Sequence, residues 1–166
     1  MVQYVFVALM VAAALYDITT YRIPNILVLL VGVLFIGIAL LHRDDVSWGG
    51  HFGAAALCLV AGLIPYYYRQ MGAGDVKLLS AAALWSGLDA LPPFLLLIAL
   101  SGAAFTLLVI GMRIVLSSGR IASLILGEQA GPRLLQRGEG IPYGVAICIG
   151  SIAALPWYPP WVWALN

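Results

Sequence analysis

Charged residues are scarce in this chain. Only 9% of its 166 residues are Asp, Glu, Lys or Arg, and the net charge is +1, whereas charged residues make up about 25% of a soluble domain. So few charges do not cover the surface of a soluble protein, and their balance excludes a nucleic acid as the partner. The two cysteines, Cys58 and Cys148, lie in apolar runs without C-x-x-C spacing, so we expect packing residues and no zinc or redox site.

Hydrophobic residues are correspondingly abundant. They make up 63% of the chain and form long runs, each close to the roughly 20 residues that cross a bilayer as a helix. We therefore predict an all-α, polytopic membrane protein with about six transmembrane helices in one domain, residues 1–166. The first run has no basic region before it, so we expect a retained helix and not a signal peptide. The predicted segments are Val2–Tyr16, Ile26–Leu41, Phe52–Tyr67, Val76–Leu91, Phe94–Leu116 and Pro142–Trp163.

The basic residues lie mostly on one side of this predicted bundle. The connections between segments one and two, three and four, and five and six, with their flanks, hold seven of the eight basic residues. Arg43 alone lies on the other side. The positive-inside rule then places these connections in the cytoplasm and both termini outside. In the longest connection, Ser117–Gly140, the stretch RIASLIL fits an amphipathic surface helix or a plain solvated loop. The seven basic residues are Arg22, Arg69, Lys77, Arg113, Arg120, Arg133 and Arg137.

Two acidic residues stand at the predicted cytoplasmic boundary. Asp17 ends the first segment and Asp75 begins the fourth, and acids at membrane depth are costly and tend to be functional. Two carboxylates about 4 Å apart would repel by about 4 kcal/mol at an effective dielectric near 20, so a touching pair would share a proton and could hydrolyse a peptide bond. Alternatively, each acid reaches water or caps a helix, Asp75 at a helix N-terminus. We expect the remaining acids, Asp44, Asp45, Asp89, Glu128 and Glu139, to be solvated loop charges.

The residues around these acids have two interpretations each. Gly72 and Gly74 flank Asp75 and either let a substrate backbone approach or only form a tight turn. Lys77 and Arg22 either act on an aspartate or a substrate acid, or extend to the interface as ordinary membrane-flanking cations. Gly144 favours close helix packing near the site.

The combination of motifs is more specific than its parts. Asp17 followed by Arg22-Ile23-Pro24-Asn25, then Gly72-Ala73-Gly74-Asp75-Val76-Lys77-Leu78, then Ile141-Pro142-Tyr143-Gly144, resembles the type IV prepilin peptidase family, GxGD aspartic proteases of the cytoplasmic membrane. The resemblance implies that Asp17 and Asp75 are the catalytic pair, with no metal or cofactor. It also implies a prepilin substrate, cut on the cytoplasmic side between a short basic leader and an apolar helix. The supporting residues it implies are Arg22, Pro24, Asn25, Gly72, Gly74, Lys77, Pro142 and Gly144.

Longer members of that family differ from this chain near the N-terminus. They carry a cytoplasmic insert, often with paired CxxC motifs, that is associated with N-methylation of the new pilin terminus. Here the chain starts in the first segment and the first connection is short, so we expect no methyltransferase activity. The chain is similar to the compact peptidases of Flp/Tad-type pilus systems. The Tyr16-Asp17 pair and the GxGD motif also resemble presenilin and signal peptide peptidase, whose C-terminal Pro-Ala-Leu motif is absent.

Two other classes of function stay open at this point. A small ion- or proton-coupled transporter would use the acids as a relay, and a non-catalytic membrane assembly subunit would use them only structurally. Incubation with a prepilin, followed by a search for a shortened product, separates the three classes. The sequence leaves the oligomeric state open.

The charge asymmetry generates a prediction about topology. Reporter fusions in the connections after the first, third and fifth segments are expected to report a cytoplasmic position, because these connections carry seven of the eight basic residues. Fusions at residue 45 and after residue 166 are expected to report the outside. A cytoplasmic C-terminus would overturn both the orientation and the predicted side of Asp17 and Asp75.

Overall fold

The computed structural model describes residues 1–117 and 140–163, and all regular structure in these residues is helical. This confirms the predicted all-α class. The sequence left open whether the stretch RIASLIL forms a surface helix or a loop, and these residues lie outside the described ranges. The helices are α1 (Val2–Thr20), α2 (Asn25–Leu41), α3 (Trp48–Tyr67), α4 (Ala73–Ser86), α5 (Leu91–Ser117) and α7 (Tyr143–Ala153), followed by the short 3₁₀ helices η2 (Leu155–Trp157) and η3 (Pro160–Trp163).

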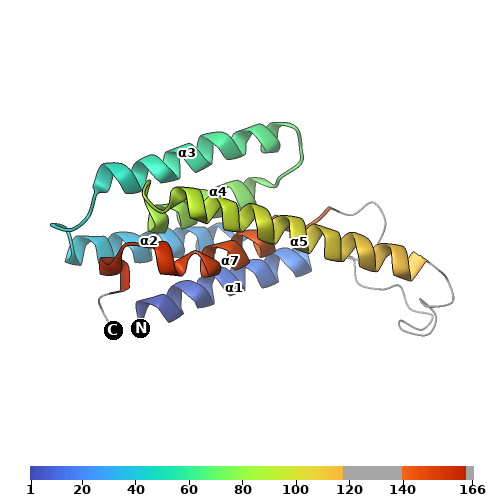
Figure 1. The fold of residues 1–166 in the computed structure, drawn as a ribbon, viewed down its shortest axis with the longest axis horizontal. Helices are drawn as coiled ribbons and strands as arrows, with labels where there is room; N and C mark the ends of the chain where they lie inside the picture. The colour runs from blue at the N-terminus through green and yellow to red at the C-terminus, as the bar shows by residue number, and fades with distance from the viewer. Residues whose placement is uncertain (118–139, 164–166) are drawn as a thin grey trace.

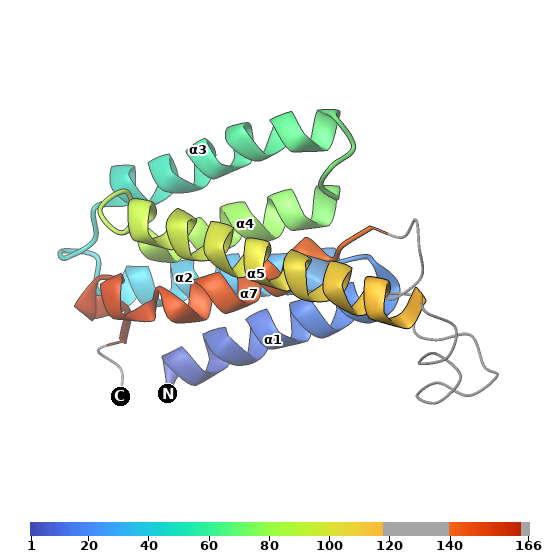
Figure 2. The ribbon, with the colours of Figure 1, turned by 45° about the vertical axis from the view of Figure 1, so that its right-hand side comes forward.

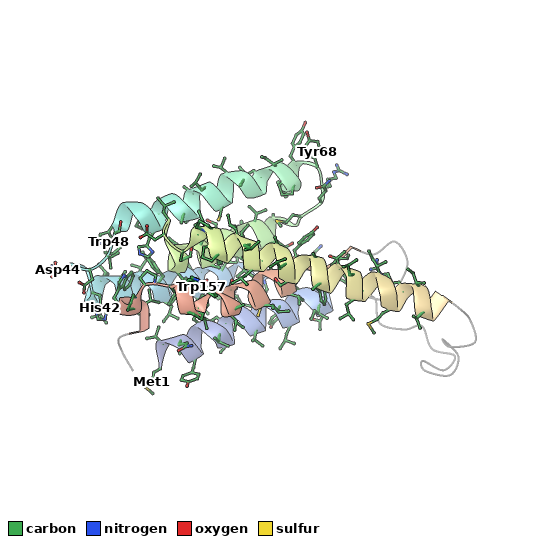
Figure 3. All side chains as sticks on the ribbon, in the orientation of Figure 1. Met1, His42, Asp44, Trp48, Tyr68 and Trp157 are labelled. Atoms are coloured by element: carbon green, nitrogen blue, oxygen red, sulfur yellow. The ribbon has the colours of Figure 1, made fainter. Side chains whose placement is uncertain are left out.

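The helices form one bundle in which the chain runs back and forth (Figure 1). The start of α1 lies at the same end as η3, which α1 contacts, and the loops α1–α2 and α3–α4 lie at the opposite end in both ribbon views (Figure 2). In Figure 3, Met1, His42 and Asp44 lie at the first end and Tyr68 at the other. Both ends of the described chain therefore share one side of the bundle, whereas the side of the membrane on which they lie stays a prediction.

Helix α4 lies at the centre of the packing. Its Trp85 is fully buried, with its ring centroid 4.6 Å from that of Phe6 in α1 and 5.8 Å from that of Phe35 in α2. The indole Nε1–H of Trp85 donates to the backbone oxygen of Val31 at 3.2 Å, so the polar atom of this large side chain is satisfied inside the core. Three small residues in a row, Ala81–Ala83, let the neighbouring helices pack closely around α4.

Large apolar side chains cover much of the outer surface. On α1 alone, Tyr4, Val5, Val11 and Leu15 are exposed, whereas Phe6, Met10, Ala13 and Asp17 are buried. Apolar surface of this extent is costly in water. The exposed faces and the long apolar helices together indicate an integral membrane protein.

Three of the six α-helices in the described ranges are long and apolar enough to cross a membrane, namely α1, α3 and α5. Helices α2, α4 and α7 have 17, 14 and 11 residues. At about 1.5 Å per residue, α4 and α7 are about 21 and 16 Å long, which is less than the roughly 30 Å hydrocarbon core. The prediction of six full spans is therefore not confirmed.

Helix α4 is shorter than the predicted segment 76–91 because Gly87 ends it. This glycine has φ 62°, in the left-handed region that favours glycine. The ring of His51 packs where a Cβ would be, 3.1 Å from its ideal position. Apolar residues continue past this turn, so hydropathy alone did not reveal the break.

Prolines divide the predicted last segment, 142–163. Helix α7 ends at Ala153, and Pro156, Pro159 and Pro160 follow within seven residues. A proline has no N–H for the helix ladder and disfavours the α conformation in the residue before it. The chain therefore leaves α7 as two short 3₁₀ turns and not as one long helix.

Helices α5 and α7 approach most closely at Gly150. A Cβ built at this glycine would lie 2.5 Å from the Cα of Ile98 in α5. Real atoms do not approach so closely, and the obstacle is backbone, so any side chain at position 150 forces the two helices apart.

Gly150→Ala is expected to destabilise the protein by about 1–3 kcal/mol, the usual cost of overpacking. The measurement is thermal unfolding in detergent micelles. Gly37→Ala in α2 is the matched control, because nothing lies within 4 Å of its Cβ position. Alanine also stabilises a helix interior more than glycine does. Equal melting temperatures for the two variants would contradict the close α5–α7 contact.

Candidate active site

Asp17 lies on the buried face of α1. Only 4% of its surface is exposed, and it follows Phe6, Met10 and Ala13 along one helical face. The sequence predicted that Asp17 ends the helix, but α1 continues to Thr20. The extra turn places the carboxyl inside the bundle and not at its rim.

The N-terminus of α7 holds the Asp17 carboxyl. The backbone N–H of Gly144 donates to Oδ2 of Asp17 at 2.7 Å. Pro142 is the N-cap of α7, so Gly144 N–H is one of the first-turn donors that have no partner within the helix. The positive end of the α7 dipole therefore faces Asp17.

Only glycine fits at position 144. A Cβ there would lie 2.8 Å from Oδ2 and 3.0 Å from Cβ of Asp17. The last residue of the Ile-Pro-Tyr-Gly motif thus lets the α7 backbone approach an acid that is 127 positions away in the sequence.

Asp75 lies in the first turn of α4 and is held by its own helix. Its Oδ2 accepts a hydrogen bond from the N-cap residue, Gly72, at 3.1 Å, the backward half of a capping box. The residue is 7% exposed, and its Oδ1 is buried and accepts no hydrogen bond from the residues that the structure describes. The Asp75 carboxyl lies close enough to that of Asp17 for their negative charges to repel.

The two acids line the same two cavities. The first, of about 330 Å³, also borders the α3–α4 loop and the residues before α7, and the second, of about 360 Å³, borders the α1–α2 loop. Tyr21 and Gly72 line both cavities as well. The structure therefore brings Asp17 and Asp75 together at the boundary of two partly open hollows.

The other residues predicted from sequence surround the second cavity for the most part. Its lining includes Arg22, Asn25, Gly72, Gly74 and Lys77. Lys77 Nζ donates to Oδ1 of Asn25 at 3.1 Å, which joins the starts of α4 and α2. This contact was not expected from the sequence, because the two residues are 52 positions apart.

Three of the supporting residues, Gly74, Pro24 and Pro142, lie where loops meet the starts of helices. Gly74 packs against the α1–α2 loop, since a Cβ there would lie 3.1 Å from Cβ of Ile23. Pro24 is the N-cap of α2 and lines neither cavity. Pro142 lines the first cavity.

Sequence reasoning missed several residues that border the first cavity. They include Tyr21 and Arg69, which have φ values of 54° and 56°, the left-handed region that residues with a Cβ rarely adopt. Strained backbone tends to gather at functional sites, but nothing in a lone Tyr or Arg reveals it. The lining residues to which the sequence assigned no role in the site are Tyr21, Tyr66, Arg69, Gln70, Met71, Gly140, Ile141 and Tyr143.

The arrangement suits proton transfer. Two buried carboxyls that interact through their charges do not both ionise easily, so one keeps a proton while the other is a base. Within residues 1–117 and 140–163, no three His, Cys, Asp or Glu side chains gather as a metal site would require. The described residues thus offer two acids, the three nearby cations Arg22, Arg69 and Lys77, and several backbone donors.

Comparison with known proteins covers the part of the chain that carries both acids, but not the Ile141–Gly144 motif. The model of the type IV leader peptidase family matches residues 4–107, more than half of the chain, including Asp17 and Asp75. The chain belongs to this family, which indicates a protease. Searches of curated proteins and of solved structures found no match.

Gly144→Ala is expected to lower peptidase activity by about 100-fold, because a catalytic group displaced by about 1 Å can lose that much. The new methyl group would meet the Asp17 carboxyl. The measurement is the rate of substrate cleavage by purified protein. Gly111→Ala, at a position with nothing within 4 Å, is expected to retain activity, and equal rates for the two variants would contradict the role of the Gly144 contact.

Proposed function

We propose that this protein is an aspartic endopeptidase that removes the leader of type IV prepilins or pseudopilins. The observation that carries the proposal is the burial of Asp17 and Asp75 beside the same two cavities, within the range that the family model matches. In this proposal the two acids are the catalytic pair, and the GxGD and Ile-Pro-Tyr-Gly motifs position them.

The reaction uses a water molecule between the two carboxyls. The ionised aspartate takes a proton from the water as the water oxygen attacks the scissile carbonyl carbon. The protonated aspartate donates its proton to the carbonyl oxygen and stabilises the charge that develops there. When the C–N bond breaks, the proton taken from water passes to the leaving amine, and no acyl-enzyme forms. Because the two titrations are coupled, the roles of acid and base belong to the pair.

The hydrogen bonds around the pair support this chemistry. Gly144 N–H holds one oxygen of Asp17, and Gly72 N–H holds one oxygen of Asp75. Both contacts fix the carboxyl groups before substrate arrives, which lowers the cost of ordering them in the transition state. The buried Oδ1 of Asp75, to which the described residues donate no hydrogen bond, is available to the water or the substrate.

The cations of the second cavity are proposed to act on the substrate. Lys77 uses one donor on Asn25, and an ammonium group has three. Arg22 is exposed and lines the same cavity. Both are suited to hold a substrate carbonyl or carboxylate beside the reacting bond.

The substrate proposal follows from the family and from the position of the acids in the bundle. Type IV leader peptidases act on proteins that join a leader to an apolar helix, and both acids lie close to the loops α1–α2 and α3–α4. This end carries Arg22, Arg69 and Lys77, so we propose that it faces the cytoplasm and that the protein resides in the cytoplasmic membrane. Among the described residues, the two buried acids lie together at one end and form no relay across the bilayer, which favours a peptidase over a transporter.

Asp17→Asn and Asp75→Asn are each expected to reduce prepilin cleavage by about 100-fold or more, because an amide side chain is neither a general acid nor a general base near neutral pH. Asparagine keeps an oxygen that accepts the hydrogen bond from Gly144 or Gly72, so the fold is expected to persist. The measurement is conversion of purified prepilin to a shorter product, with its new N-terminus read by mass spectrometry.

Asp44→Asn is the control, because Asp44 is 95% exposed at the opposite end of the bundle. It is expected to cleave at the rate of the unaltered protein. Substantial cleavage by either motif variant would exclude the two-aspartate mechanism, and no cleavage by the unaltered protein would exclude a prepilin as its substrate.

A further inference from the structure

A third hollow, of about 590 Å³, lies among α4, α5 and α7. Its walls are almost wholly apolar: Leu79 comes from α4, Leu95, Ala99 and Ala103 from α5, and Ala146 from α7. We refer to it as the apolar groove. Ala99 and Ala103 are exposed, so the groove is open to the surroundings of the bundle along α5.

The apolar groove continues into the site. Met71 and Tyr143 line both the groove and the first cavity, in which Asp17 and Asp75 lie. The first cavity in turn shares both acids with the second, polar cavity. The three hollows therefore join in series, from an apolar stretch beside α5 to the acids and then to a polar space with Arg22 and Lys77.

Helix α5 is much longer than the other two helices that line the groove. Helix α5 has 27 residues, whereas α4 has 14 and α7 has 11. Figure 2 shows α5 running past both neighbours toward the end that holds the loops α1–α2 and α3–α4. The α5 residues that line the groove lie between 95 and 107, in the half of α5 that packs along α7, where Ser101 Oγ donates to the backbone oxygen of Ala146.

The residues along the groove favour a helix as its occupant. On α5, Ala99 and Ala103 are four residues apart, as are Gly102 and Thr106, and all four line the groove. Small residues at this spacing let a second helix approach the backbone closely, and close packing drives association of helices in a bilayer.

We propose that the apolar groove holds the apolar helix of the substrate against α5, with the start of that helix at Asp17 and Asp75. The inference rests on the proposed function and adds the place where the uncut protein docks. The three hollows run from apolar, past the two acids, to polar. An uncut substrate runs in the same order, from its apolar helix to the polar leader that precedes it. The peptide bond at this change of polarity then lies beside the two carboxyls.

Two neighbouring alanines of α5 make a matched test. Ala103 lines the groove and Ala104 does not, although both are exposed on the same helix. A photo-reactive p-benzoylphenylalanine replaces one or the other in the Asp75→Asn background, which leaves the substrate uncut. Irradiation in phospholipid vesicles with full-length prepilin is expected to link position 103 to the apolar helix of prepilin at least about fivefold more than position 104.

Kinetics supply a second readout. Ala103→Trp fills the groove and is expected to raise KM for prepilin by about tenfold, the effect of one overpacked contact, with kcat changed less. Ala104→Trp is expected to leave both values unchanged. Melting temperatures of both variants show whether either has lost its fold, and the cross-links do not depend on the tryptophan variants.

The outcomes separate this inference from the proposed function. If the unaltered protein cuts prepilin but positions 103 and 104 link to it equally, the groove is not the docking site and the proposed function stands. Links from position 103 only to lipid, or only to another part of the same chain, would also overturn the inference. If the unaltered protein does not cut prepilin, both proposals fail.

Discussion

The hydrogen bond from Gly144 N–H to Asp17 Oδ2 is the contact on which the rest of the site depends. It is 2.7 Å long and joins the first helix of the chain to the last. A buried carboxylate in an apolar bundle is costly without a partner, and here the partner is an N–H that α7 cannot satisfy internally. The cost of burying the acid and the cost of ending the helix are thus reduced by one contact.

The same principle applies to the second acid. Asp75 is held by the N-terminus of its own helix, through Gly72, so the starts of α4 and α7 both point first-turn donors at the site. Glycine stands at each of these donors because a side chain would meet the carboxyl that the donor binds, Oδ2 of Asp17 at 2.8 Å or Oδ2 of Asp75 at 3.1 Å. The glycines near the acids therefore serve the approach of backbone to carboxylate.

Helix length is the second constraint on the molecule. The N-termini of α4 and α7 lie at the site, where Gly72 and Gly144 donate to the two acids, and α5 continues past both helices. Short helices are usually weak elements in a membrane protein, but α4 is enclosed by the others, with Trp85 packed against Phe6 and Phe35.

The sequence by itself determined the all-α class and the family, because hydrophobic runs and short motifs are local properties. It also identified Asp17, Asp75 and the glycine motifs as candidates for the site. Helix ends were less predictable: Gly87 and Pro156 lie within apolar sequence, so hydropathy merged the helices with the turns beyond them. Only the tertiary structure decided that Gly144 holds Asp17, that Lys77 bonds Asn25 and that Tyr21 and Arg69 border the acids. These contacts join residues far apart in the chain, and their geometry depends on how helices of unequal length pack, which no local pattern of residues encodes.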